Sequence, residues 1–121
     1  MRRIAIVEDF PAIRKLYKNA LEPMEAEIYE YASGSSAVQE IASFHPDLLI
    51  LDHRLPDMHG FSILEQVPEM QKIPVLVISG YLESEYLPHY QALGVTRILS
   101  KPIKIETLVE QVSSLLETNE H

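Results

Sequence analysis

Carboxylates follow two apolar runs of this chain, at the point where each run ends. Glu8 and Asp9 come directly after Ile4–Val7, and Asp52 comes directly after Leu48–Leu51. If both runs are strands of one parallel sheet, the three acids meet at its carboxyl edge, where open α/β sheets bind ligands. Two like charges about 4 Å apart repel by about 4 kcal/mol at an effective dielectric constant near 20, so such a cluster needs a cation, or one acid must take up a proton. Mg²⁺, which prefers carboxylates, water and phosphate oxygens, fits this set.

A hydroxyl and an amine end two later apolar runs, at Ser79 and at Lys101. Phosphoryl transfer needs an in-line nucleophile, a metal ion and donors for the equatorial oxygens. A carboxylate can be that nucleophile and form an acyl phosphate. We therefore expect Asp52 to be the nucleophile, with Ser79 and Lys101 donating to the phosphoryl oxygens. Asp9 and Asp52 would bind the cation, and Glu8, which is longer, could bind it through water.

Short apolar runs alternate with segments of helical periodicity along the chain. Four of the five runs are apolar throughout, as strands buried on both faces are, whereas residues 26–31 alternate and indicate an edge strand. The expected strands are Arg3–Val7, Ala26–Tyr31, Leu48–Leu51, Val75–Ile78 and Arg97–Leu99. Parallel strands need crossovers, which helices supply on both faces of the sheet. The sequence thus predicts a doubly wound (βα)5 fold of the α/β class, flavodoxin-like, with strand order 2-1-3-4-5.

Serines and prolines mark the helix boundaries between these strands. We expect Ser35 or Ser36 to cap the second helix and Ser84 to cap the fourth. Pro68 should cut the third helix short or kink it. The tail Glu117–His121, beyond the last apolar stripe, is expected to be frayed.

The composition indicates one cytoplasmic domain over residues 1–121. The chain is 46% hydrophobic, enough for a single core, and its formal net charge of −8 argues against nucleic acid and anionic membranes as partners. It contains no cysteine, which excludes disulfides and thiolate metal sites and fits a reducing compartment. The apolar run after Arg2 and Arg3 is too short for a signal peptide. No run approaches the ~20 apolar residues of a membrane span.

Two pairs of ring-bearing side chains leave structural and functional alternatives open. His53 and His59 could suggest a transition-metal site, but no cysteine or acidic spacing supports zinc, so surface histidines are the preferred interpretation. Tyr86 and Tyr90, spaced i and i+4, form either a surface for a partner or a packed pair on one helix face.

Together these motifs resemble the receiver domain of two-component response regulators, over essentially the whole chain. The motifs are Glu8-Asp9, Leu49–Asp52, Leu55–Met58 before Gly60, Ser79-Gly80 and Lys101-Pro102. The resemblance implies that Asp52 accepts a phosphoryl group from the phosphohistidine of a sensor histidine kinase or a phosphotransfer protein. It also implies Mg²⁺ ligation by Asp9, Asp52 and the backbone carbonyl of Arg54, and a cis bond between Lys101 and Pro102.

The resemblance further implies a signalling switch that assists its own phosphorylation and dephosphorylation and is not a turnover enzyme. It would signal to a downstream protein partner or to a fused output domain. One position departs from the pattern, since Ile98 stands where relatives usually carry Tyr or Phe. An aliphatic β-branched side chain is stiff and cannot give the aromatic rotamer signal of the family. We therefore expect switching to rely on Ser79 and the loop around Tyr81–Leu87.

Alternative functions fit the same architecture. A pseudo-receiver, an interaction module that is never phosphorylated, is favoured only by Ile98. A flavin-binding electron carrier would need a Ser/Thr/Gly-rich loop after the first strand, where this chain has Glu8–Pro11. A haloacid-type phosphatase would place a second Asp two positions after Asp52, where Arg54 stands.

Overall fold

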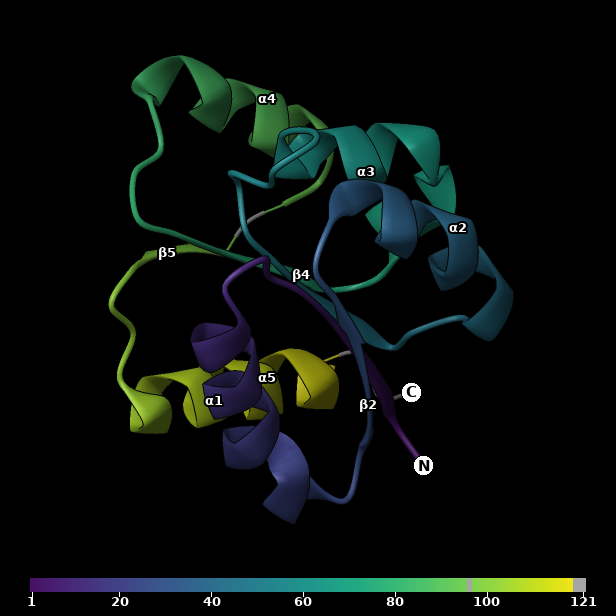
Figure 1. Ribbon diagram of the computed structural model, residues 1–121, viewed down its shortest axis with the longest axis vertical. Coiled ribbons are helices and arrows are strands. Elements are labelled where there is room, and N and C mark those ends of the chain that lie inside the picture. Colours follow the sequence, from purple (N-terminus) through teal and green to yellow (C-terminus); the bar gives the residue numbers. More distant parts are fainter. Residues whose placement is uncertain (96, 119–121) are drawn as a thin grey trace.

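A central parallel sheet separates two layers of helices in the computed structural model, which describes residues 1–95 and 97–118 (Figure 1). The elements alternate along the chain as the apolar runs predict. They are β1 Arg3–Val7, α1 Pro11–Leu21, β2 Glu27–Tyr31, α2 Gly34–Phe44, β3 Leu48–Leu51, α3 Gly60–Gln66, β4 Val75–Ser79, α4 Leu87–Ala92, β5 Arg97–Ser100 and α5 Ile105–Thr118. Three 3-10 turns, η1 Glu22–Met24, η2 Pro68–Lys72 and η3 Ser84–Tyr86, stand between them.

The strand order is β2-β1-β3-β4-β5 and every neighbouring pair is parallel. This confirms the predicted fold class and places β2 at an edge. The register sets Val7 beside Leu51 and Leu51 beside Val77, so β1, β3 and β4 end at the same edge of the sheet. Residues that follow these strands are therefore neighbours although they are far apart in sequence.

Two apolar cores, one on each face of the sheet, hold the three layers together. α1 and α5 cover one face, and α2, α3 and α4 cover the other (Figure 1). Alternation along β1 divides its side chains between the cores, with Ile4 and Ile6 toward α1 and α5, and Ala5 and Val7 toward α2 and α3. Each fully buried Leu or Ile contributes about 1.5–3 kcal/mol by leaving water. The edge that carries the acids is thus anchored by both cores.

The predicted helix caps were wrong in two places. Ser33, and neither Ser35 nor Ser36, caps α2, because its Oγ accepts the backbone N–H of Ser36 at 3.2 Å. Ser84 caps no α-helix and instead opens η3, which runs into α4.

Other boundaries agree with the proline signals. α3 ends before Pro68, where η2 begins, so the helix is cut short as predicted. α5 continues through Thr118, so the first part of the expected frayed tail is helical, and residues 119–121 lie outside the described part. None of the described helices is long and apolar enough to cross a membrane.

Candidate phosphoacceptor site

The sheet brings the three acids together at its carboxyl edge. The backbone N–H of Glu8 donates to Tyr31 O at 3.0 Å, and that of Asp52 donates to Val7 O at 3.0 Å, so both residues continue the strand ladders. Carboxylate oxygens of Glu8, Asp9 and Asp52 lie within 4.8 Å of one another. Glu8 and Asp52 are 2% and 7% exposed, whereas Asp9 is exposed. We refer to this cluster, in which two acids are buried and Asp9 is exposed, as the acidic crevice.

Lys101 reaches this crevice from the end of β5. Its backbone N–H donates to Ser79 O at 2.8 Å, and the peptide bond to Pro102 is cis. Its Nζ donates to Glu8 Oε1 at 2.6 Å and to Asp52 Oδ2 at 3.0 Å. The ammonium therefore bridges two of the three acids.

Charge in the site is only partly balanced. Burial raises the pKa of Glu8, although hydrogen bonds from Lys101 and from the Phe10 N–H oppose the rise. Burial alone would lower the pKa of Lys101, but its hydrogen bonds to Glu8 and Asp52 outweigh this and raise it. The cluster holds three carboxylates, and the Lys101 ammonium pairs with two of them, Glu8 and Asp52. An arrangement of oxygen donors with surplus negative charge is suited to a hard divalent cation.

Ser79 and Arg54 stand at the site but do not aim their side chains at Asp52. Ser79 is the last residue of β4, and its Oγ donates to its own loop, at Tyr81 O, over 3.0 Å. The backbone N–H of Arg54 donates to Asp52 Oδ1 over a long 3.4 Å, while its guanidinium pairs with Glu83. The structure thus gathers Glu8, Asp9, Asp52 and Lys101 and leaves the Ser79 hydroxyl turned away.

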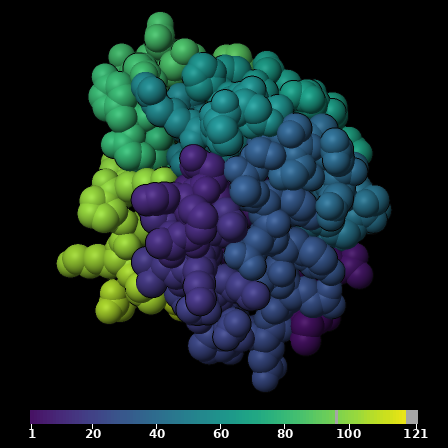
Figure 2. All heavy atoms as spheres, viewed as in Figure 1, coloured from purple at the N-terminus to yellow at the C-terminus, as the bar shows by residue number. Residues whose placement is uncertain are grey.

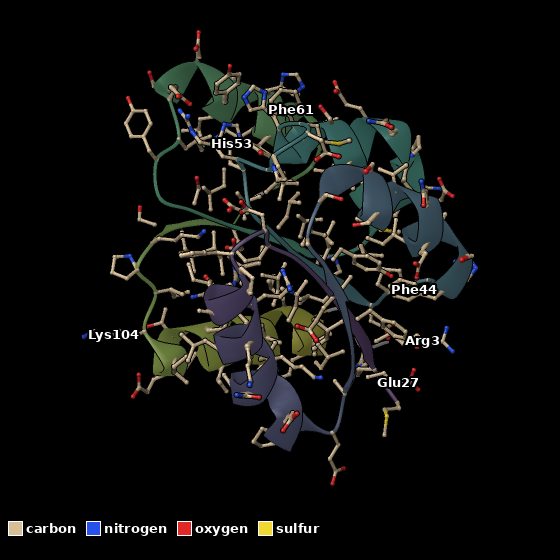
Figure 3. The ribbon with its side chains drawn as sticks, viewed as in Figure 1. Arg3, Glu27, Phe44, His53, Phe61 and Lys104 are labelled. Atoms are coloured by element: carbon tan, nitrogen blue, oxygen red, sulfur yellow. The ribbon has the colours of Figure 1, made fainter. Side chains whose placement is uncertain are left out.

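His53 is fully buried, so its interpretation as a surface histidine was wrong, whereas His59 is exposed. The side chain of His53 lies under α4, with Nδ1 2.6 Å from the Tyr90 hydroxyl and its ring stacked 4.9 Å from that of His59. Figure 3 shows His53 and Phe61 together beside α4. Burial lowers the pKa of His53. Tyr90 is fully buried and Tyr86 half-buried with its ring 5.0 Å from His53, which favours packing for this pair.

Two acidic residues in the neighbouring loops, Asp57 and Glu83, make contacts that sequence reasoning did not predict. Asp57 accepts hydrogen bonds from the backbone N–H groups of Gly34 and Ser35, at 2.9 and 2.8 Å, and so holds the loop after β3 to the start of α2. Glu83 pairs with Arg54 across two loops. Asp57 lies within a recognised motif, but nothing local to Glu83 in the sequence indicates its partner, which lies 29 residues away.

An apolar groove of about 320 Å³ adjoins the crevice. Lys101 lines both, and the other lining residues are Ile13, Leu16, Tyr17, Pro102 and Ile103. Figure 2 shows α1 in the middle of one face of the molecule, beside the yellow-green segment that follows β5. The acidic crevice therefore opens next to an apolar surface that a protein could contact.

Residues 4–113 match the response regulator receiver domain family, so the chain belongs to that family. The polar-differentiation response regulator DivK of Brucella ovis is 27% identical over 118 residues, covering 95% of this chain and 96% of DivK. A protein-glutamate methylesterase/protein-glutamine glutaminase of Geobacter sulfurreducens is 34% identical over 104 residues. This match covers 84% of this chain but only 28% of that relative's length. The chain likewise spans only 25% of the length of another relative, the regulatory protein LuxO of Vibrio cholerae.

Solved structures agree with this assignment. A CheY-like response regulator receiver domain from Methanospirillum hungatei superimposes with a TM-score of 0.91 at 26% identity, covering 98% of this chain and 95% of that one. The signal receiver domain of a LuxO repressor protein from Vibrio parahaemolyticus gives 0.87 at 28% identity, covering 98% and 92%. The chain is thus a signalling domain of the response regulator class.

Proposed function

We propose that this receiver domain accepts a phosphoryl group on Asp52 in a Mg²⁺-dependent reaction and acts as a signalling switch. The donor is the phosphohistidine of a sensor histidine kinase or a phosphotransfer protein. The observation that carries the proposal is the placement of Asp52, whose carboxylate shares a crevice with Glu8 and Asp9 and receives a hydrogen bond from Lys101 Nζ at 3.0 Å.

The residues at the crevice fit a magnesium ion. Asp9, Asp52 and the backbone carbonyl of Arg54 would hold it, with Glu8 bound through water. All these donors are oxygens, as Mg²⁺ prefers, and the cluster retains negative charge beyond what Lys101 offsets. When bound, the ion would neutralise charge on the transferring phosphoryl group.

The reaction requires little from the protein beyond a nucleophile and donors. An Asp52 carboxylate oxygen forms an O–P bond while the N–P bond of the phosphohistidine breaks and the imidazole leaves with the electron pair. Lys101, already held at Asp52 Oδ2, donates to a phosphoryl oxygen. The Ser79 hydroxyl donates to another after it leaves the Tyr81 carbonyl. Water then attacks the phosphorus, the P–O bond to Asp52 breaks, and inorganic phosphate leaves, which restores the free carboxylate and resets the switch. The protein thus assists its own phosphorylation and dephosphorylation and is not a turnover enzyme.

The family membership supports a cellular setting for the proposed reaction. We propose that the domain is one unit over residues 1–121 and that it acts in the cytoplasm with its donor. The groove between α1 and the segment after β5 is the contact surface for the donor protein, because it is apolar and shares Lys101 with the crevice. The output is a downstream protein partner or a fused output domain, with no direct binding of nucleic acid or membrane by this segment.

Phosphorylation by a small donor tests the proposal. With acetyl phosphate and Mg²⁺, we expect the intact protein to gain the mass of one phosphoryl group, and Asp52→Ala to gain none. Asp47→Asn is the matched control, because Asp47 precedes β3 at the opposite end of the same strand, where it binds the Arg3 N–H. Labelling that survives in Asp52→Ala would reject Asp52 as the acceptor.

A pseudo-receiver that acts only through its surface is the second candidate, favoured by Ile98. It predicts no adduct with acetyl phosphate or phosphoramidate at any Mg²⁺ concentration. An adduct on Asp52 alone would remove it.

A further inference from the structure

Glu83 joins the two loops that flank the phosphoacceptor. It lies in the loop after β4, and its Oε1 pairs with the guanidinium of Arg54 in the loop after β3. Its other oxygen, Oε2, faces His53 Nε2 at 3.7 Å. Both of these facing atoms are buried and have no hydrogen-bond partner among the described residues. One carboxylate therefore interacts with the two residues that directly follow Asp52.

A hydrogen-bond chain fixes the orientation of His53 toward Glu83. The backbone N–H of Phe61 donates to the Tyr90 hydroxyl, and that hydroxyl shares a 2.6 Å hydrogen bond with His53 Nδ1. This bond and the stacking against His59 hold a ring that is 0% exposed. They leave His53 Nε2 facing Glu83 Oε2 across 3.7 Å, beyond hydrogen-bonding distance. Glu83 therefore packs against a rigid partner on one side and pairs with Arg54 on the other.

Arg54 is the cation that Glu83 binds beside the site. Its backbone N–H contacts Asp52 Oδ1 at 3.4 Å, and its guanidinium carbon lies 5.9 Å from the centre of the Tyr81 ring. The Tyr81 carbonyl in turn accepts the hydroxyl of Ser79. The Arg54–Glu83 pair therefore ties the loop after β3 to the loop after β4, in which the Tyr81 carbonyl holds the Ser79 hydroxyl.

We infer that Glu83 is a positioning residue for phosphoryl transfer, which holds the Arg54 guanidinium and the loop after β4 in the unphosphorylated arrangement. The inference rests on the proposed function of Asp52. A phosphoryl group on Asp52 brings a charge of about −1.5 to −2 and three acceptor oxygens. Arginine binds phosphate through charge-assisted, often bidentate hydrogen bonds, so the phosphoryl group competes with Glu83 for Arg54. Release of Glu83 frees the loop and the Ser79 hydroxyl.

Glu83→Gln tests this competition in the whole chain. Acetyl phosphate gives its phosphoryl group to Asp52 as its own O–P bond breaks and acetate leaves. Because the variant frees Arg54, we expect phosphorylation to be about two- to fivefold faster, the range that corresponds to one exposed ion pair. The gain should shrink in high salt, since screening weakens the ion pair of the wild type. Glu85→Gln is the matched control, because it removes the same charge from the neighbouring η3 turn and Glu85 has no ion pair with any described residue.

An Arg54→Gln background separates positioning from simple charge. If Glu83 acts through Arg54, Glu83→Gln has no effect on the rate in that background. A gain that persists there, or an equal gain in Glu85→Gln, would overturn the inference, because long-range charge would explain it. Equal rates in wild type and Glu83→Gln, with an adduct on both, also overturn it while the proposed function stands. No adduct on the wild-type protein rejects the proposed function, and the inference falls with it.

Discussion

At the scale of single residues, Tyr17 links the acidic crevice to stability at high pH. Its side chain is 3% exposed, and its pKa is raised from 10.0 to about 12, mainly by burial. The positive charge of Lys101 opposes this rise, and the negative charge of Glu8 adds to it. The unfolded chain loses this proton first as pH rises, so the folded state binds more protons between these two values. The free energy of unfolding must then fall across that window, by on the order of 2 kcal/mol for this group.

Tyr17→Phe removes the titrating hydroxyl and should flatten this alkaline loss relative to the wild type. Urea unfolding at about pH 9 and about pH 11 measures it, and other groups that titrate there cancel in the comparison. Tyr81→Phe is the control, because that ring is 65% exposed and reaches solvent in both states. An identical alkaline decline in wild type and Tyr17→Phe would contradict the assignment.

At the scale of elements, the start of α3 is pressed against Asp52, the residue that follows β3. The Gly60 N–H donates to His53 O at 2.7 Å, and a Cβ on Gly60 would lie 2.5 Å from Asp52 O and 3.0 Å from the Tyr90 hydroxyl. Asp52 O is a backbone atom, so it cannot move away from an added Cβ as the end of a flexible side chain could. We expect Gly60→Ala to lower the free energy of unfolding by about 1–3 kcal/mol, despite the better helix propensity of alanine.

Gly80→Ala is the matched control, because a Cβ there meets nothing within 4 Å. Chemical denaturation should show it within about 0.5 kcal/mol of the wild type. A neutral Gly60→Ala would mean that α3 can shift away from Asp52 without cost.

At the scale of the whole molecule, side-chain contacts run from the neighbour of Asp52 to α4. Ile98 has no aromatic ring, whereas His53, which follows Asp52, hydrogen-bonds to Tyr90 and packs against Tyr86. We expect a phosphoryl mimic such as beryllofluoride to shift backbone amide signals of residues 81–87 and of α4 as well as those of the crevice. Asp52→Ala with the mimic is the control. Shifts confined to the crevice would argue against a transmitted switch.

Much of this architecture was predictable because its causes are local. Apolar runs of four or five residues set the strands, and the rule that parallel strands share a carboxyl edge predicts that Glu8, Asp9 and Asp52 are neighbours. α3 ends before Pro68 because proline has no backbone N–H and its ring clashes with the preceding helical turn.

Contacts between distant segments decided the rest. Ser33 caps α2, and the N–H of Gly34 donates to Asp57, which lies 23 residues further along the chain than Gly34. His53 is buried because α4 covers it with Tyr90. The pairing of Arg54 with Glu83 depends on two loops meeting above the sheet. The sequence by itself determined which elements form and where the acids gather, because hydrophobic periodicity and strand polarity act over a few residues. Only the tertiary structure decided which partner each polar side chain chose, because such choices depend on distances between loops that folding alone brings together.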